Sequence, residues 1–152
     1  MAAKTPDGPF TIRRAEQRDY ASVVTLLQSL NLPTDGVQEH FANFLVLVLG
    51  KSIIATVGLE MYGHHALLRS LGVAEKHRGK GYGRQLVRAI VSKAGQYQID
   101  TLVLLTNTAK DFFSKFGFET VPRDAIDGKI KSSVEFRSAC PETAVCMRLT
   151  IE

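Results

Sequence analysis

The chain has 152 residues, of which 45% are hydrophobic and 22% charged, and its 19 basic and 15 acidic residues give a formal net charge of +4. A chain of this length and composition is expected to bury a core of its own and to leave little room for a second domain. The two cysteines, Cys140 and Cys146, lack the Cys-x-x-Cys spacing, so a disulfide framework and a zinc ribbon are excluded.

The apolar segments of the sequence do not suit a secreted or membrane protein. The first nine residues lack the apolar segment of a secretory signal, and the longest apolar stretch, Phe44 to Leu49, is too short to cross a bilayer. We therefore expect a cytoplasmic protein. Residues 1–9, rich in proline, glycine and polar side chains, are predicted to form a flexible tail in front of a single domain over residues 10–152.

The first half of the chain begins with a strand-like pattern and continues with helix-like ones. Apolar and polar residues alternate over 10–13, and apolar residues recur at helical spacing over about 18–30 until Pro33 ends the pattern. A short second helix is predicted next, with Gln38 and Glu39 on its polar face. The residues of its other face are Val37, His40, Phe41 and Phe44.

Three apolar or β-branched runs follow and predict an antiparallel meander. They cover Phe44 to Leu49, Ser52 to Glu60 and His65 to Val73, and the Gly50-Lys51 pair between the first two is typical of a hairpin turn.

The second half alternates between helix and strand. A helix is predicted from Gly81 to about Gln96 and a strand from Thr101 to Leu105, which with the preceding strand forms a parallel crossover unit. The remaining predictions are a helix over Ala109 to Phe116 capped by Gly117, a strand ending at Val121-Pro122, a turn at Asp127-Gly128, and extended chain over Ser132 to Phe136 and Thr143 to Ile151. Together the elements indicate an α/β (α+β) protein.

The most unusual segment is Lys76-His77-Arg78-Gly79-Lys80-Gly81-Tyr82-Gly83-Arg84, which lies between a predicted strand and a predicted helix. Its glycines allow a tight turn that brings backbone N–H groups close to a ligand, and the helix that follows presents a positive N-terminal end. Because the spacing fits neither a Walker loop nor the dinucleotide fingerprint, the segment predicts a phosphate cradle of another type. A glycine-rich helix entry with solvated charges is the alternative.

The same segment, Arg78-Gly79-Lys80-Gly81-Tyr82-Gly83, resembles the Arg/Gln-x-x-Gly-x-Gly/Ala signature of the GCN5-related N-acetyltransferases (GNAT). A second segment, Ala109 through Phe118, is similar to the family's downstream Ala-x-x-Leu-Tyr-x-Lys-x-Gly-Phe motif, and the two occur in the family's order. The resemblance covers about residues 10–150 and implies a GNAT fold, with a mixed central sheet of about six or seven strands and about four helices. It also implies acetyl-CoA as co-substrate and direct acetyl transfer to an amine.

The resemblance further assigns coenzyme-binding residues. Backbone groups of Leu71 and Val73 would pair with the pantetheine arm, the Leu71 N–H would polarise the thioester in a catalytic role, and the glycine turn would hold the pyrophosphate. The complete predicted set is Leu71, Gly72, Val73, Arg78, Gly79, Lys80, Gly81, Tyr82, Gly83, Arg84, Thr106, Asn107 and Phe113.

Two residues depart from the family pattern. Phe113 stands where the family often has a tyrosine that donates a proton to the leaving thiolate, and Thr106 stands where an asparagine is common, with Asn107 adjacent. A coenzyme A-binding sensor with little turnover is therefore an alternative to the enzyme.

Several short segments resemble a narrower group, the small acetyltransferases of arsenic-resistance operons. That group is associated with glutamate-like amino acids such as arsinothricin and phosphinothricin, which implies a small-molecule amine substrate of this kind or another organoarsenical. The segments are Glu39-His40-Phe41, Leu59-Glu60-x-Tyr62-Gly63, Ala66 to Ser70, Leu104 to Ala109, Ser132-Ser133-x-Glu135-Phe136 and Cys140-Pro141.

The acceptor side is predicted from charged residues near these segments. Glu39 and Glu60 are the candidate catalytic carboxylates, Glu39 for substrate contact and Glu60 for a base that acts through water. A solvated or ion-paired carboxylate is the alternative for each. Arg69 interrupts an apolar strand, so it is expected either to bind an anionic substrate group or to pair with Glu60. The substrate-binding set is Glu39, Arg69, Ser70, Ser132 and Ser133.

Other partners are judged from the same sequence. His64 and His65 are adjacent and point to opposite faces of a strand, so no metal is expected. Cys140 and Cys146 are expected to be small buried side chains, with arsenic binding as the alternative. The basic residues cluster at one turn, which disfavours a nucleic-acid partner, while a homodimer is left open.

Overall fold

The computed structural model describes residues 2–5, 8–126, 128–139 and 143–151. By its internal contacts the chain divides into two compact units, residues 1–59 with 70–92, and residues 60–69 with 93–152. Over the described residues the strands follow the hydrogen-bonded order β1-β2-β3-β4-β5-β6-β8-β7. Strands β4 (Ser52–Tyr62) and β5 (His65–Val73) contribute residues to both units.

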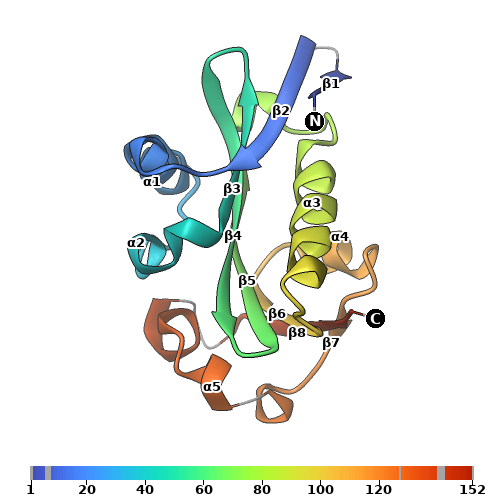
Figure 1. The fold of residues 1–152 in the computed structure, drawn as a ribbon. Helices are drawn as coiled ribbons and strands as arrows, with labels where there is room; N and C mark the ends of the chain where they lie inside the picture. Colours follow the sequence, from blue (N-terminus) through green and yellow to red (C-terminus); the bar gives the residue numbers. More distant parts are fainter. Residues whose placement is uncertain (1, 6–7, 127, 140–142, 152) are drawn as a thin grey trace. The chain divides into compact units, whose positions relative to one another are not determined.

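The first unit is built on an antiparallel meander. Strand β1 (Ala2–Thr5) pairs with β2 (Gly8–Arg14), β2 with β3 (Phe44–Leu49), and β3 with β4. Helices α1 (Tyr20–Ser29) and α2 (Val37–His40) lie on one side of β2–β4, and α3 (Tyr82–Gln96) lies on the other (Figure 1). Because both faces are covered, β3 is apolar along its whole length and does not alternate.

The core on the α1 and α2 side explains the apolar spacing of the sequence. Its fully or nearly fully buried members are Val23, Leu27, Val37, Phe41, Phe44 and Val46. Phe44 pairs in register with Gly58, and a Cβ built on Gly58 would lie 2.3 Å from the Phe44 ring. Glycine at this strand position therefore leaves the space that the ring occupies.

The second unit contains the parallel part of the sheet. The first residues of β5 pair in parallel with β6 (Thr101–Thr106), β6 pairs antiparallel with β8 (Val145–Thr150), and β8 with the short β7 (Glu119–Thr120). A core cluster on one face of these strands joins them to the segment between β7 and β8. Its buried members are Leu67, Val103, Ile126, Ile130 and Cys146.

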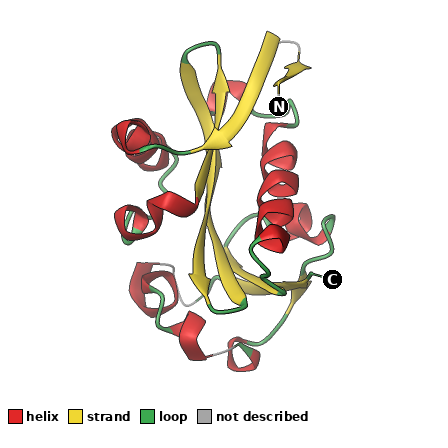
Figure 2. Ribbon diagram, viewed as in Figure 1, coloured by secondary structure: helices red, strands yellow, loops and turns green. Residues whose placement is uncertain are grey.

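Short helical segments connect the strands. Helix α4 (Lys110–Ser114) follows β6, and α5 (Gly128–Lys131) lies between β7 and β8, where Figure 2 shows mostly helix. Single 3₁₀ turns occur at Gln17–Asp19, Phe41–Asn43, Glu75–His77 and Arg123–Ala125, and a π-helical turn at Glu135–Ala139. Among the described residues, no helix combines the length and apolar character that crossing a bilayer requires.

Most predicted elements are confirmed, and three regions differ. The structure has a strand at Ala2–Thr5, where we predict a tail, because backbone pairing with β2 needs no apolar side chains. The prediction of extended chain over Ser132 to Phe136 is wrong, since this stretch is helical and Arg137 N–H donates to the Ser133 carbonyl. Gly128 begins α5 instead of completing a turn, and its predicted partner Asp127 lies outside the described residues.

Candidate active site

The glycine-rich segment forms an open turn in the first unit. After β5 ends at Val73, Gly79 and Gly81 adopt left-handed φ angles of +78° and +87°, and α3 begins at Tyr82. A Cβ built on either glycine would meet no protein atom within 4 Å. The turn therefore needs glycine for its backbone conformation, and its outer side is open to a ligand.

The first turn of α3 completes an anion site. The Gln85 N–H donates to the Gly81 carbonyl at 3.1 Å, at the start of the hydrogen bonds of this 15-residue helix. The N–H groups before Gln85 therefore lie ahead of the first of these hydrogen bonds. Lys76, Arg78 and Arg84 are exposed and Lys80 is half-buried. Backbone donors, a helix dipole and four cations suit a pyrophosphate group, so the residues present fit the coenzyme that the sequence resemblance implies.

Tyr82 anchors this turn through its side chain. Its ring is 1% exposed and packs edge-on against Phe10 and His77, with centroid distances of 5.4 and 6.3 Å. Of the predicted coenzyme-binding residues, Tyr82 is thus part of the core, and only its backbone lies at the helix start. The predicted role of its neighbours Gly79 to Arg84 in coenzyme binding stays a prediction.

Strand β5 is irregular immediately before the residues predicted to bind the pantetheine arm. Ser70 adopts a left-handed φ of +60°, which is uncommon for a residue other than glycine. Gly72 is buried, and a Cβ built on it would lie 2.6 Å from Leu30 Cδ1. Gly72 is therefore required for packing on this unit, whereas Leu71 and Val73, its neighbours, are only half-buried.

The predicted coenzyme residues of the second unit lie around the start of α4. The Thr106 hydroxyl accepts a hydrogen bond from the Ala109 N–H at 3.0 Å, and Asn107 is exposed. Phe113 is 5% exposed and packs against Phe112 and Phe118. Thr106 thus stabilises the turn into α4, and Phe113 contributes an apolar ring where a tyrosine would offer a hydroxyl.

A buried network of charged and polar groups occupies the second unit. Arg69 Nη1 donates to Glu60 Oε2 at 2.7 Å, and Arg69 Nε lies 3.3 Å from Glu135 Oε2. The side chains of these three residues are 0%, 1% and 5% exposed. The Tyr62 hydroxyl donates to Glu60 Oε1, and the Ser133 hydroxyl interacts with Tyr62.

The network contains one of the two interactions that the sequence leaves open for Arg69, the ion pair with Glu60. Binding of an anionic substrate group by Arg69 stays a prediction. The network adds a second carboxylate, Glu135, to which the sequence analysis assigns no role. Tyr62 is likewise missed, although its position two residues after Glu60 on one strand places both on the same face. Ser133, predicted to bind substrate, is buried and accepts a hydrogen bond from the Glu135 N–H.

The phenol of Tyr62 provides a pH-dependent test of this network. Burial, followed by the hydrogen bond with Glu60, raises the pKa of Tyr62 from 10.0 to about 12. The folded protein holds the phenol proton more tightly than the unfolded chain does, which stabilises the fold. This stabilisation is complete below the pKa of the unfolded state and is lost as the pH rises through the pKa of the folded state. We expect the free energy of unfolding to fall less steeply between pH 10 and 12 in Tyr62→Phe than in the wild type.

Denaturant unfolding at several alkaline pH values measures these slopes. Tyr97→Phe, which removes the hydroxyl of an exposed tyrosine, is the matched control and should keep the wild-type slope. Equal slopes for the wild type and Tyr62→Phe would contradict the raised pKa of Tyr62 that its burial and its hydrogen bond to Glu60 cause.

The remaining predicted residues are not members of this network. Glu39 is exposed, and the exposed Ser132 donates to the Lys129 carbonyl at 2.6 Å. Cys146 is buried in the second core cluster and burial raises the pKa of its thiol, whereas Cys140 lies outside the described residues. Over the described part of the chain, no group of three or more His, Cys, Asp or Glu residues gathers as a metal site would require.

Strand β5, the open glycine turn and the N-terminal end of α3 form the kind of site that suits a phosphate-bearing coenzyme. Residues 40–120 match the family model of the acetyltransferase (GNAT) domain, and the chain belongs to this family. The chain is thus an acetyltransferase of the GNAT type, and the predicted GNAT fold is confirmed.

Three relatives illustrate the similarity. An uncharacterised N-acetyltransferase of Chlorobaculum tepidum is 25% identical over 95% of this chain and 99% of its own. The N-acetylglutamate synthase of Neisseria gonorrhoeae, solved with coenzyme A and N-acetyl-glutamate, superposes with a TM-score of 0.81 at 18% identity over 94% of this chain. Rv2747 of Mycobacterium tuberculosis, solved with CoA, gives 0.77 at 19% identity, covering 93% of this chain and 99% of that one. This chain spans only 35% of the synthase.

Proposed function

We propose that this N-acetyltransferase transfers acetyl from acetyl-CoA directly to the amino group of a small glutamate-like amino acid. Arsinothricin, phosphinothricin or another organoarsenical are the acceptors that the resemblance to arsenic-resistance acetyltransferases suggests, which would make the reaction a detoxification. The similarity in fold to an N-acetylglutamate synthase supports the acceptor class. The open left-handed turn at Gly79 and Gly81 is the observation that carries the coenzyme half of the proposal.

The coenzyme would be held mainly by backbone groups. N–H groups over Gly79 to Arg84 would bind the pyrophosphate, with Arg78 and Lys80 adding charge, while Leu71 and Val73 would pair with the pantetheine arm as an added strand does. The bound thioester supplies an activated acetyl group. The Leu71 N–H is proposed to polarise the thioester carbonyl, so that orientation and polarisation account for much of the rate.

Acceptor contacts follow from which carboxylates remain accessible. Both carboxylate oxygens of Glu60 accept hydrogen bonds, and the side chain is 1% exposed. We therefore propose that Glu60 holds Tyr62 and Arg69 in place, instead of serving as a base that acts through water. Glu39, an exposed carboxylate, is proposed to contact the acceptor's ammonium group and to take the proton that it must lose before its nitrogen attacks the thioester carbonyl. The second N–H proton leaves with the coenzyme A thiolate as the amide forms. Because coenzyme A thiolate is a reasonable leaving group, the transfer does not require a hydroxyl at Phe113.

Thiol release in the presence of acetyl-CoA and a panel of amines tests this function. We expect turnover with glutamate, phosphinothricin or arsinothricin, and none with spermidine or tyramine, which carry no acidic group. Turnover restricted to the amines without an acidic group would contradict the acceptor class. Calorimetric binding of acetyl-CoA without thiol release from any amine would contradict catalysis and indicate a coenzyme sensor.

A further inference from the structure

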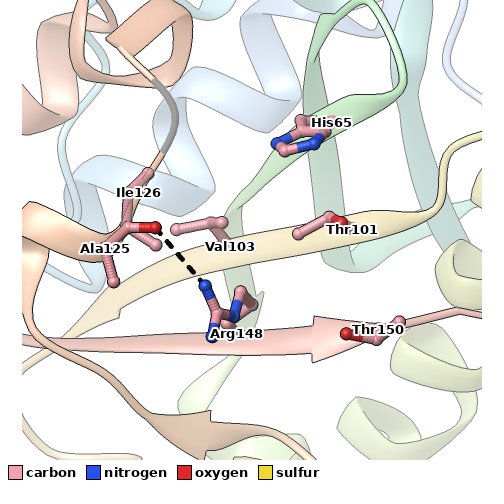
Figure 3. A pocket seen from close by; sticks show the side chains of 7 residues that line it. All are labelled: His65, Thr101, Val103, Ala125, Ile126, Arg148 and Thr150. Atoms are coloured by element: carbon pink, nitrogen blue, oxygen red, sulfur yellow. Dashed lines mark hydrogen bonds between the residues drawn. The ribbon is translucent and has the colours of Figure 1, made fainter.

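A small pocket of about 170 Å³ opens on one face of β5, β6 and β8 in the second unit (Figure 3). Its lining shares no residue with the coenzyme or acceptor sets described above. The residues are His65, Thr101, Val103, Ala125, Ile126, Arg148 and Thr150.

Strand register brings these side chains to one face. Thr101 lies opposite both His65 on β5 and Thr150 on β8, and Val103 lies opposite Arg148. Residues two apart on a strand share a face, so these side chains form two rows across the strands. The first row, at Thr101, is polar, and the second row, at Val103, combines an apolar side chain with a guanidinium. The second row is continuous with the core cluster through Val103, so the pocket joins a polar rim to an apolar floor.

The loop after β7 covers the pocket and orients its main cation. Ala125 and Ile126 form one wall, and Arg148 Nη1 donates to the Ala125 carbonyl at 3.4 Å, as Figure 3 shows. This contact holds the guanidinium over the pocket while leaving its other N–H donors for a ligand. Ile126 is 6% exposed and provides apolar surface beside the guanidinium.

The charges that line the pocket favour an anion. Among the described residues, its lining contains the Arg148 guanidinium and the His65 imidazole, and no carboxylate. Acidic groups beside the lining include Asp100, whose Oδ1 lies 3.8 Å from His65 Nε2 and accepts from the Thr101 hydroxyl, and Glu119, the strand partner of Arg148. The exposed Asp124 precedes the lining residue Ala125 in the chain. Asp100 is 61% exposed and therefore largely screened by solvent.

We propose that this pocket binds a small aliphatic carboxylate. A planar guanidinium donates two parallel hydrogen bonds to a carboxylate, and the Thr150 hydroxyl and the His65 ring offer further donors. The apolar floor of Val103 and Ile126 accommodates the carbon part of the ligand, which an inorganic anion would leave unused. The volume limits the ligand to a few non-hydrogen atoms.

Titration of the ¹⁵N-labelled full chain with sodium propionate tests the proposal. We expect saturable shifts of the Thr101 and Thr150 amide signals, and an affinity about tenfold or more lower in Arg148→Met, which removes the guanidinium and keeps an unbranched apolar chain. Thr150→Val, which keeps the side-chain shape and removes the hydroxyl, should weaken binding by about threefold. Arg88→Met, at an exposed arginine of α3, is the matched control and should bind as the wild type does.

The outcomes separate the proposal from its alternatives. Wild-type shifts that do not saturate, or saturation that persists unchanged in Arg148→Met, would overturn it. Equal affinity for sodium phosphate and propionate would overturn the carboxylate class. Unshifted amide signals elsewhere in Arg148→Met establish that the variant is folded, and the readout is independent of acetyl transfer.

Discussion

Replacement of Arg69 with Met is expected to lower the free energy of unfolding by about 3–5 kcal/mol, because it removes the cation from two buried carboxylates. The guanidinium lies 2.7 Å from Glu60 and 3.3 Å from Glu135, and none of the three side chains exceeds 5% exposure. Methionine keeps the unbranched apolar part of the side chain and lacks the guanidinium, so the lost charge pairing is expected to dominate. Denaturant unfolding of the wild type and the variant at pH 7 measures the difference as a shift of the midpoint.

Two further variants identify the cause of this loss. Arg88→Met removes an exposed arginine and should change stability by less than about 0.5 kcal/mol. Glu60→Gln introduced into the Arg69→Met background removes one of the carboxylates that the first change leaves behind, and should recover part of the stability. If Arg69→Met retained wild-type stability and only raised the KM for the acceptor, Arg69 would be a substrate ligand and not a structural ion-pair partner of Glu60 and Glu135.

The sequence predicts the strands of this protein where apolar runs are bounded by turn residues. The run from His65 to Val73 coincides with β5, and the Gly50-Lys51 pair forms the turn between β3 and β4 as expected. Periodicity does not predict β1, because its pairing with β2 depends on backbone groups that every sequence has. It also does not predict the helical turn at Glu135, where a buried charge is compensated by residues remote in the chain.

The sequence predicts those parts of the candidate site whose residues lie close together along the chain. The cradle residues Gly79 and Gly81 lie two positions apart, and glycine favours the left-handed φ angles that both adopt, so a tight turn here is predicted from the sequence. The pair of Glu60 and Arg69 is foreseen because one hairpin connects them. Glu135 lies 66 residues after Arg69, and nothing in local spacing brings the two together; only the packing of the segment before β8 does.

The second large effect is expected for Gly81→Glu, which should weaken acetyl-CoA binding by on the order of 100-fold or more, since like charges brought together cost several kcal/mol. A Cβ at Gly81 meets open space, so the new carboxylate would extend into the region proposed for the pyrophosphate. The left-handed φ of +87° also adds backbone strain of about 1–2 kcal/mol, which any side chain there would cause. Calorimetric titration with acetyl-CoA measures the affinity, and thermal unfolding measures the strain.

Gly50→Glu separates the charge effect from the strain. Gly50 also has a left-handed φ, of +62°, and open space around its Cβ position, but it lies in the hairpin turn between β3 and β4. This variant should lose a comparable amount of stability and bind acetyl-CoA as tightly as the wild type. Both substitutions add one negative charge to the same unit. A loss of affinity confined to Gly81→Glu would therefore locate the phosphate site at the start of α3. An equal loss in both variants, or a loss in neither, would place the phosphate site elsewhere.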